Sequence, residues 1–300
     1  MSIEARHLGH VYSPGTPFSF QALDDASVKI PEGKMTAIIG QTGSGKSTFV
    51  QHLNGLLVPT AGELEILGRK ILPGMKIRDL KELRRQVGLV FQFPEYQLFE
   101  ETIAKDIAFG PKNFGVPEED ALEQVKRILP VVGLDETYLD RSPFDLSGGQ
   151  KRRVAIAGIL VLDPEVLVLD EPAAGLDPQG SREMMELFSD LNRKEGKTVL
   201  LVTHDMEHVL KYCDHVIVMD QGKVAREADV QEFFSHPEWL EAIGIDPPGI
   251  VRLQLKLKEK GMDLGDIRLR DADLIQAIRD WKENHSAVQP EKTANGEVQA

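Results

Sequence analysis

One segment of the sequence has the glycine pattern that holds phosphate groups. We call it the phosphate loop; it consists of Gly40, Gln41, Thr42, Gly43, Ser44, Gly45, Lys46, Ser47 and Thr48. Glycines let backbone N–H groups turn toward phosphate oxygens, and the following helix adds partial positive charge at its N-terminus. Lys46 would reach the β- and γ-phosphates of a nucleoside triphosphate, and the Ser47 hydroxyl would ligate Mg²⁺. The alternative is an ordinary glycine-rich turn that ends in a lysine.

Two acidic residues follow an apolar run further along the chain. Asp170 and Glu171 come directly after Val166–Leu169. Because buried parallel strands present functional groups at their carboxyl ends, this pair should lie near the phosphate loop. Asp170 would hold Mg²⁺ directly or through water, and Glu171 would accept a proton from a water aligned for attack on the γ-phosphorus. A solvated acidic strand end is the alternative.

A second glycine-rich turn precedes another helix. The Ser147 loop, formed by Ser147, Gly148, Gly149 and Gln150, leads through basic residues into the apolar stretch Val154–Leu160. Ser147 is a favourable N-cap, and the two glycines expose backbone N–H groups beside a helix N-terminus. The sequence therefore predicts a second anion-binding site. The alternative is a plain turn before a basic helix.

The elements that position these loops follow from the alternation of short apolar runs with amphipathic stretches. This alternation is typical of an α/β fold in which helices cover a mostly parallel sheet. Buried strands are expected at Met35–Ile39, Val166–Leu169, Val199–Thr203 and His215–Met219. Three further strands predict an antiparallel portion near the N-terminus, at Ile3–His10, Ala26–Ile30 and Gly62–Gly68.

Helical spacing of apolar residues marks the remaining elements. The helix after the phosphate loop should have one apolar face, formed by Phe49, Val50, Leu53, Leu56 and Leu57. A helix over Glu118–Val132, acidic on its other face, indicates a helical insert. The turn Asp246–Gly249 helps to separate a C-terminal appendage. There, residues 250–257 fit a strand or a helix, residues 274–281 fit a helix, and residues 286–300 are polar enough for a disordered tail.

Composition excludes several classes of protein. The 300 residues include 35 Lys and Arg against 48 Asp and Glu, a formal net charge of −13, which disfavours coating of nucleic acid or of an anionic membrane. No stretch approaches ~18 continuous apolar residues, and the N-terminus lacks the apolar core of a signal peptide. The single cysteine, Cys213, excludes an intrachain disulfide. We expect it to be a buried, inert thiol of a cytosolic chain.

In their order along the chain, the phosphate loop, the Ser147 loop and Asp170–Glu171 resemble the motifs of the ATP-binding cassette (ABC) family. The resemblance covers roughly Ser2–Arg226. It implies an α/β P-loop ATPase core with an N-terminal antiparallel β subdomain, a helical insert at about residues 93–160, and ATP with Mg²⁺ as ligands. The long coiled coils of repair-type relatives, the second cassette of translation-type relatives and the membrane helices of fused exporters are all missing. The ATPase subunit of a transporter remains.

The same resemblance implies roles for four more residues. Gln92 would sense Mg²⁺ and the attacking water, and His204 would bind the γ-phosphate. Asp177 would cross a subunit interface, and Tyr12 would stack on adenine. The alternatives are a polar loop residue at Gln92 and a packing role for Tyr12.

The family also implies that two cassettes share each nucleotide. ATP would lie between the phosphate loop of one subunit and the Ser147 loop of another, so hydrolysis, with Lys46 and Glu171 as catalytic groups, would require a dimer. Binding of ATP would close the pair, and hydrolysis would reopen it.

The segment Phe91–Ile103, continuing to Asp106–Asn113, resembles ATPases of energy-coupling factor (ECF) transporters. The resemblance implies a surface that receives a transmembrane scaffold subunit. Its apolar anchors would be Phe93, Tyr96 and Phe99. Its glutamates would pair with arginines of the partner, at Glu95, Glu100 and Glu101. The alternative is that the aromatic residues pack the insert against the core.

The segment Tyr12–Phe18 and the appendage resemble the A2-type member of these ATPases. This implies an ABC ATPase domain at residues 1–228 and an appendage at residues 229–285 that helps to bind a different, A1-type cassette. The remaining implied partners are the scaffold and a substrate-capture membrane subunit, without nucleic acid. The complex would import a vitamin or a metal ion, with this chain peripheral at the cytoplasmic face of the cell membrane.

Two rival functions are also compatible with the sequence. The residues His204, Glu207 and His208 match a zinc-peptidase pattern. A zinc site needs both histidines on one helical face, whereas His204 is expected at a strand end. The other rival is a soluble ABC ATPase with a regulatory or repair role.

Overall fold

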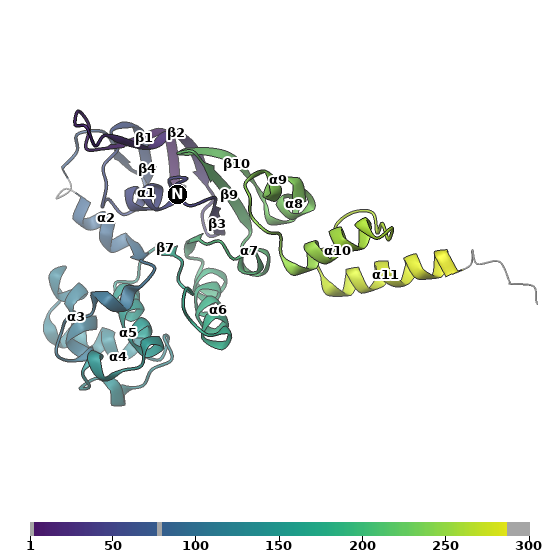
Figure 1. Cartoon of the computed structure of the whole chain (residues 1–300). Coiled ribbons are helices and arrows are strands. Elements are labelled where there is room, and N and C mark those ends of the chain that lie inside the picture. The colour runs from purple at the N-terminus through teal and green to yellow at the C-terminus, as the bar shows by residue number, and fades with distance from the viewer. Residues whose placement is uncertain (1–2, 77–79, 287–300) are drawn as a thin grey trace, which may run out of the picture.

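The computed structural model of the chain describes residues 3–76 and 80–286. A six-stranded sheet in the order β10-β9-β3-β8-β7-β6 forms its centre (Figure 1). Its strands are β3 (Met35–Ile39), β6 (Val87–Val90), β7 (Val166–Asp170), β8 (Thr198–Val202), β9 (His215–Asp220) and β10 (Lys223–Asp229). All neighbours pair in parallel except β10, which is antiparallel to β9 at the edge. The predicted mostly parallel sheet is confirmed.

A second, antiparallel sheet is built from the N-terminal strands. Its order is β2-β1-β4-β5, with β1 (Ile3–Tyr12), β2 (Phe20–Ile30), β4 (Ala61–Ile66) and β5 (Arg69–Ile71). The strand β2 begins six residues before the predicted Ala26, because it pairs with β1 as far as Tyr12 opposite Phe20. Leu67 and Gly68 both have positive φ, which gives the tight turn that joins β4 to β5.

Each face of the large sheet packs on its own apolar cluster. Met35, Ala37 and Ile39 of β3 point into one cluster, with α6 (Pro178–Glu195) and α7 (Met206–Tyr212). The intervening residue Ile38 points into the other cluster, with α1 (Lys46–Leu53) and the antiparallel sheet. Because both faces are covered, the strands are almost continuously apolar, as expected for buried parallel strands.

The helix α1 is shorter than predicted. Phe49, Val50 and Leu53 are buried on its inner face, but Leu56 and Leu57 lie beyond its end. The helix stops because Gly55 has a φ of 67°, a left-handed conformation that terminates helices.

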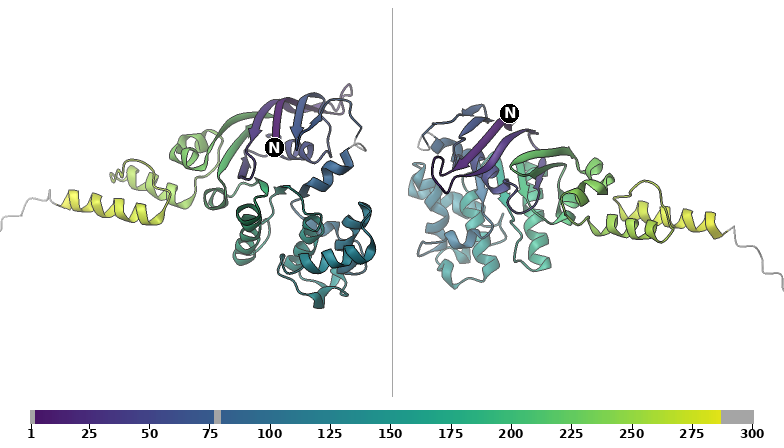
Figure 2. Two further views of the ribbon diagram at one scale, coloured as in Figure 1. Left: turned by 180° about the vertical axis from the view of Figure 1, so that it is seen from behind. Right: turned by 45° about the horizontal axis from the view of Figure 1, so that its top comes forward.

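The predicted helical insert connects β6 to β7 and lies beside the sheets (Figures 1 and 2). Its helices are α3 (Ile103–Asn113), α4 (Glu118–Ile128) and α5 (Gly148–Leu160); the short helix α2 (Lys81–Gln86) lies before β6, outside the insert. Single 3₁₀ turns occur at η2 (Pro94–Gln97), η3 (Glu136–Tyr138) and η4 (Pro143–Asp145). The helix predicted to reach Val132 ends at Ile128 because Pro130 has no N–H to extend the hydrogen-bond ladder.

The C-terminal appendage is helical. It contains α8 (Val230–Ser235), α9 (Pro237–Ala242), α10 (Gly249–Glu259) and α11 (Asp271–Ser286). The helices α10 and α11 extend away from both sheets (Figure 2). The ambiguous stretch at residues 250–257 is helical, and the predicted helix at residues 274–281 is confirmed. Residues 287–300 of the predicted tail lie outside the described residues.

Two further observations bear on the predictions from composition. Cys213 is buried, and burial raises the pKa of its thiol, which is the state of an inert cysteine. Within residues 3–76 and 80–286, no helix combines the length and the apolar character that crossing a bilayer requires.

Candidate nucleotide site

The phosphate loop joins β3 to α1 in a conformation that only glycine can adopt at two positions. Gly40 has a φ of 145°, and a Cβ there would lie 2.1 Å from the carbonyl oxygen of Met219. Gly45 has a φ of 100°, and a Cβ there would lie 2.7 Å from the carbonyl oxygen of Ala22. Gly45 is also the N-cap of α1, so that position offers the first N–H groups of the helix no side-chain acceptor. The loop therefore presents bare backbone donors, as an anion site requires.

The ammonium group of Lys46 lies over this loop. Its Nζ donates to the carbonyl oxygens of Gly40 and Gln41 at 2.8 Å each. Burial lowers the pKa of Lys46, and the negative charges of Glu171 and Asp170 oppose that shift. The positive charge is thus held at the mouth of the loop by acceptors that phosphate oxygens could replace.

Asp170 reaches the phosphate loop from the end of β7. The Ser47 hydroxyl donates to its Oδ2 at 3.4 Å. Burial and the adjacent charge of Glu171 raise the pKa of Asp170, while Ser47 and Lys46 oppose the rise. Among the described residues no group of three His, Cys, Asp or Glu side chains could hold a metal ion. Two oxygen donors beside a phosphate site fit Mg²⁺, which keeps waters and substrate oxygens in its shell.

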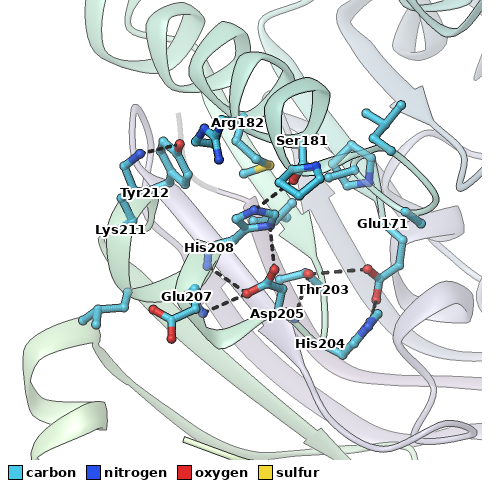
Figure 3. Close-up of a pocket in the computed structure, with 18 of the residues that line it drawn as sticks. Glu171, Ser181, Arg182, Thr203, His204, Asp205, Glu207, His208, Lys211 and Tyr212 are labelled. Atoms are coloured by element: carbon cyan, nitrogen blue, oxygen red, sulfur yellow. Dashed lines mark hydrogen bonds and ion pairs between the residues drawn. The ribbon is translucent and has the colours of Figure 1, made fainter. Parts of the chain in front are cut away.

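Glu171 is held by Thr203 and His204, which directly follow β8 (Figure 3). Its Oε1 lies 2.7 Å from Nδ1 of His204, and its Oε2 accepts from the Thr203 hydroxyl at 3.4 Å. Its N–H donates to the carbonyl oxygen of Val202 at 3.0 Å. Glu171 adopts a φ of 50°, which is unusual for a residue with a side chain and is concentrated at functional sites. The imidazole of His204 remains 81% exposed, facing the space in front of the strand ends.

The zinc-site alternative fails on geometry within the described residues. His204 is paired with Glu171, whereas His208 contacts the Ser181 hydroxyl at 3.2 Å through Nε2 (Figure 3). Glu207 accepts from the N–H of Gly249 at 2.6 Å. The three candidate ligands thus engage three different partners, and among the described residues they do not converge as a group that could hold a metal ion.

Tyr12 lies against α1 within a small polar cluster. Its hydroxyl is 3.3 Å from that of Thr48, and its ring packs edge-on to His10 at 4.6 Å between centroids. Nδ1 of His10 is 3.1 Å from Nε2 of His52, whose Nδ1 donates to the carbonyl oxygen of Thr48 at 2.7 Å. Burial lowers the pKa of His52 to about 4. Sequence reasoning missed both histidines, because neither belongs to a motif.

The Ser147 loop is exposed and satisfies its own caps. The Ser147 hydroxyl accepts from the N–H of Gln150 at 3.4 Å, and Oε1 of Gln150 accepts from the N–H of Ser147 at 3.1 Å. This reciprocal pair is a capping box at the start of α5. A Cβ added at Gly148 or at Gly149 would meet no atom within 4 Å. Unlike Gly40 and Gly45, these glycines are not required by the fold of the chain itself.

Gln92 and Asp177 occupy two exposed connections. Gln92 follows β6, whose residue Val90 pairs with Leu169 next to Asp170. Asp177 is the N-cap of α6 and accepts from the N–H of Gly180 at 2.6 Å. The structure therefore places Gln92 at the same sheet edge as Asp170, while the local role of Asp177 is helix capping.

Around the turn η2, which is expected to carry the aromatic docking surface, the aromatic residues and the glutamates differ in their exposure to a partner. Tyr96 is 83% exposed, and Phe93 and Phe99 are also exposed, although the ring of Phe99 contacts that of Phe109 in α3 at 4.8 Å between centroids. Glu95 instead turns inward and pairs with Arg152 of α5 at 2.9 Å. Glu101, just before α3, pairs with Lys105 of that helix at 2.8 Å. The expectation that Glu95 is available to a partner's arginine is therefore wrong for this conformation.

A contact that the sequence does not signal joins the appendage to the phosphate loop. Nε2 of Gln41 donates to the carbonyl oxygen of Ile243, just after α9, at 3.1 Å. A Cβ at Gly244 would lie 3.0 Å from the same amide nitrogen. The loop and the C-terminal helices are therefore in direct contact within one chain.

Comparison with known proteins identifies relatives along almost the whole chain. A family model described as ABC transporter matches residues 23–174. The energy-coupling factor transporter ATP-binding protein EcfA2 of Lactiplantibacillus plantarum is 53% identical over 278 residues, which cover 93% of this chain and 94% of the relative. The EcfA2 of Enterococcus faecalis is 51% identical, over 93% of this chain and 96% of the relative.

Solved structures agree with these relatives. The cbiO1 protein from Clostridium perfringens, described as part of the ABC transporter complex cbiONQ, superposes with a TM-score of 0.69 at 38% identity. The match covers 84% of this chain and 97% of that chain. A dimeric post-hydrolysis cassette, MJ0796 bound to ADP and Pi, superposes with a TM-score of 0.68 at 30% identity, over 76% of this chain and 98% of that chain. The chain therefore belongs to the ABC transporter family, as an energy-coupling factor transporter ATP-binding protein of the EcfA2 type.

Proposed function

We propose that the phosphate loop binds the triphosphate of ATP and that Glu171 is the general base in its hydrolysis. The bare N–H groups at the start of α1 and the ammonium group of Lys46 supply donors for the β- and γ-phosphates. Lys46 would exchange the carbonyl oxygens of Gly40 and Gln41 for phosphate oxygens. The chain is an ABC-type ATPase, and these residues are its candidate machinery.

Ser47 and Asp170 would hold Mg²⁺, with Gln92 at the same sheet edge. A bound Mg²⁺ would neutralise charge on the phosphate oxygens and orient the leaving group. The Ser47 hydroxyl and Oδ2 of Asp170 already lie 3.4 Å apart, so both oxygens face the same volume. Because Mg²⁺ binds deprotonated carboxylate, it would reverse the raised pKa of Asp170.

Glu171 would take the proton of the attacking water while His204 binds the γ-phosphate. In the present structure His204 and Thr203 satisfy both carboxylate oxygens of Glu171. His204 is exposed enough to turn from Glu171 toward a phosphate oxygen. Such a turn would leave one oxygen of Glu171 available to water, so nucleotide binding would itself release the base.

The main support for a nucleotide site shared by two cassettes is the pair of glycines in the Ser147 loop. Neither Gly148 nor Gly149 is needed by its own chain, since a Cβ at either would meet nothing within 4 Å. Bare glycines on an exposed helix N-terminus leave room for a partner's phosphate to approach the backbone. We therefore place the Ser147 loop on the nucleotide of a second cassette, with Asp177 at the same interface.

The remaining partners follow the family. An ABC dimer and membrane partner subunits are implied by the relatives. We propose that the second cassette is a different, A1-type chain, that the appendage at residues 229–285 strengthens the pair, and that Tyr12 stacks on adenine. The exposed rings of Phe93, Tyr96 and Phe99 would receive the membrane scaffold at the cytoplasmic face, in an importer of a vitamin or a metal ion.

The substitution Glu171→Gln tests the role of the base. It should preserve ATP binding and lower steady-state hydrolysis at least ~100-fold, because the amide cannot accept the proton of water. The matched control is Glu165→Gln, because Glu165 precedes the opposite end of β7 and accepts a hydrogen bond from Nε2 of Gln86. Hydrolysis close to wild type in Glu171→Gln would remove Glu171 from this role.

Mixed subunits test the shared site. If the chain pairs with itself, a Ser147→Arg chain mixed with a Lys46→Ala chain forms one intact site and one doubly defective site. Hydrolysis should therefore return in the mixture although each variant alone is inactive. For pairing with a different cassette, the two substitutions are divided between the co-expressed chains. A mixture as inactive as its parts would contradict sharing.

A further inference from the structure

Arg152 occupies a buried crossing point between three parts of the chain. It lies on α5, five residues after Ser147, and is only 3% exposed. Its Nε and Nη2 donate to the two carboxylate oxygens of Glu95 at 3.1 and 2.9 Å. Its Nη1 donates to the carbonyl oxygens of Pro172 and Ala174 at 3.3 and 2.6 Å. One guanidinium therefore connects η2, α5 and the turn that follows Glu171.

The η2 end of this connection carries the exposed rings. Glu95 lies between Phe93 and Tyr96, whose rings contact each other at 5.9 Å between centroids. The guanidinium also lies 5.8 Å from the centre of the Phe93 ring. A force applied to these rings by a partner would thus reach Arg152 through the carboxylate and through the ring face.

The other end of the connection is the backbone next to the candidate base. Pro172 and Ala174 lie one and three residues after Glu171, which has the strained φ of 50°. The Phe93 ring also approaches this turn, because a Cβ at Gly175 would lie 3.9 Å from its Cε1. Since the turn sets the backbone of Glu171, movement of Arg152 would change where the carboxylate points.

The shape of the guanidinium makes this connection specific to arginine. Four of its hydrogen bonds are directed to two sides at once, two to a carboxylate and two to carbonyl groups. Lysine would retain the positive charge, but its single ammonium group has no planar fork to span both sides. The substitution Arg152→Lys therefore keeps the positive charge while it removes the bridge between Glu95 and the carbonyl groups.

We propose that Arg152 is a positioning residue that transmits displacement of the aromatic turn η2 to the backbone beside Glu171. The inference rests on the proposed roles of Glu171 and of the exposed rings. It goes beyond them by assigning the path between the two. The hydrogen bonds of the Arg152 guanidinium go to Glu95 and to the turn at Pro172–Ala174, not to the phosphate loop. Arg152 therefore acts through that turn.

The test compares phosphate release from ATP by the cassette pair alone and by the complete membrane complex in liposomes. We expect the two rates to differ in the wild type, and their ratio measures control by the membrane subunits. We expect Arg152→Lys to reduce that ratio at least ~5-fold, the lower range of measured couplings between sites. The variant should still melt as a folded protein and should still copurify with the membrane subunits in mild detergent.

A matched pair of glutamate substitutions provides the control. Glu95→Gln weakens the pair with Arg152 and should reduce the ratio in the same direction as Arg152→Lys. Glu183→Gln removes a glutamate that pairs with Arg153, the next residue of α5, at 2.6 Å, and should leave the ratio unchanged. Tyr96→Ala should instead abolish copurification, because it alters the docking ring itself.

The outcomes distinguish failure of the role of Arg152 from failure of the proposed function. A ratio unchanged in Arg152→Lys overturns the inference, as does a loss of copurification in Arg152→Lys that equals the loss in Tyr96→Ala. Equal loss in Glu95→Gln and Glu183→Gln also overturns it, since a general destabilisation would then explain both. If the wild-type chain neither hydrolyses ATP nor binds membrane subunits, it is the proposed function that fails.

Discussion

Two helices of this chain begin with glycine-rich loops, and they begin in opposite ways. At α1 the phosphate loop is pressed against the backbone of Met219 and Ala22, and its N-cap glycine provides no side chain. At α5 the Ser147 loop is exposed and closes its own capping box with Gln150. Glycine is required by the fold in the first loop and is unexplained by the fold in the second.

The two loops therefore differ in the groups with which each would bind a ligand. The phosphate loop has its cationic, hydroxyl and carboxylate groups supplied by one chain, in Lys46, Ser47 and Asp170. The Ser147 loop has a helix N-terminus and open space beside its two glycines, and the Tyr138 hydroxyl accepts from Nε2 of its Gln150 at 3.1 Å. On the proposed function, the phosphate loop would be a site within one chain, whereas the Ser147 loop would become a site only against a second cassette.

The largest loss of stability should come from adding a methyl group to the phosphate loop. Gly40→Ala places a Cβ 2.1 Å from a carbonyl oxygen and should cost at least about 3 kcal/mol of folding free energy. Gly15→Ala is the control, because Gly15 also has positive φ but a Cβ there meets nothing within 4 Å. Chemical denaturation of both variants measures the difference, and equal losses would mean that φ strain, not the close approach, dominates.

Acid should destabilise the fold around α1 by protonating its buried histidine, His52. The pKa of His52 is about 4 in the folded chain against an ordinary value of 6.5, so between these values the unfolded chain binds the extra proton. Stability should therefore be constant above pH 6.5 and fall by up to about 3 kcal/mol as the pH decreases toward 4. Thermal melting across this range should show a smaller loss in His52→Gln; identical slopes would exclude His52 as the cause.

Adding a methyl group to the Ser147 loop should separate stability from activity. Gly148→Ala should keep or raise stability by up to about 1 kcal/mol, because alanine is favoured over glycine in a helix. The same variant should lower ATP hydrolysis by the complex about 100-fold by displacing the partner's phosphate. Gly158→Ala, in the same helix and equally free of contacts, should hydrolyse ATP normally. Full activity of Gly148→Ala would contradict the shared site.

The smallest expected effect belongs to Tyr12. Tyr12→Leu should weaken ATP binding about 10-fold by loss of base stacking. Tyr12→Phe, which loses only the contact with the Thr48 hydroxyl, should weaken it less. Titration with a fluorescent ATP analogue measures both, and equal affinity of all three proteins would assign Tyr12 to packing.

Sequence patterns predicted those features that depend on local chemistry. The phosphate loop, the acidic pair after β7 and the strand at Met35–Ile39 were all recognisable, because glycine spacing and apolar runs report backbone conformation and burial directly. Helix ends were less predictable. The end of α1 depends on the conformation of Gly55, and the end of α4 on a proline that the apolar pattern ignores.

The remaining unpredicted features depend on contacts between distant segments. Nothing in a run of basic residues indicates that Arg152 turns inward while its neighbour Lys151 does not, since burial is decided by Glu95 and by carbonyl groups near residue 173. Likewise the pairing of His10 with His52 joins a strand to a helix across 42 residues. Such contacts need the packed structure, because no local pattern encodes the partner.

The hydrogen bond from Gln41 to Ile243 affects how shortened forms of the chain should be interpreted. A protein that ends before Ile243 would lose more than helices, because the second residue of the phosphate loop would lose its acceptor. Weaker ATP binding by such a protein would then report a loosened loop and not a failure of subunits to associate. Gln41→Ala in the full chain reproduces that loss alone, and any deficit beyond it measures what the C-terminal helices do elsewhere.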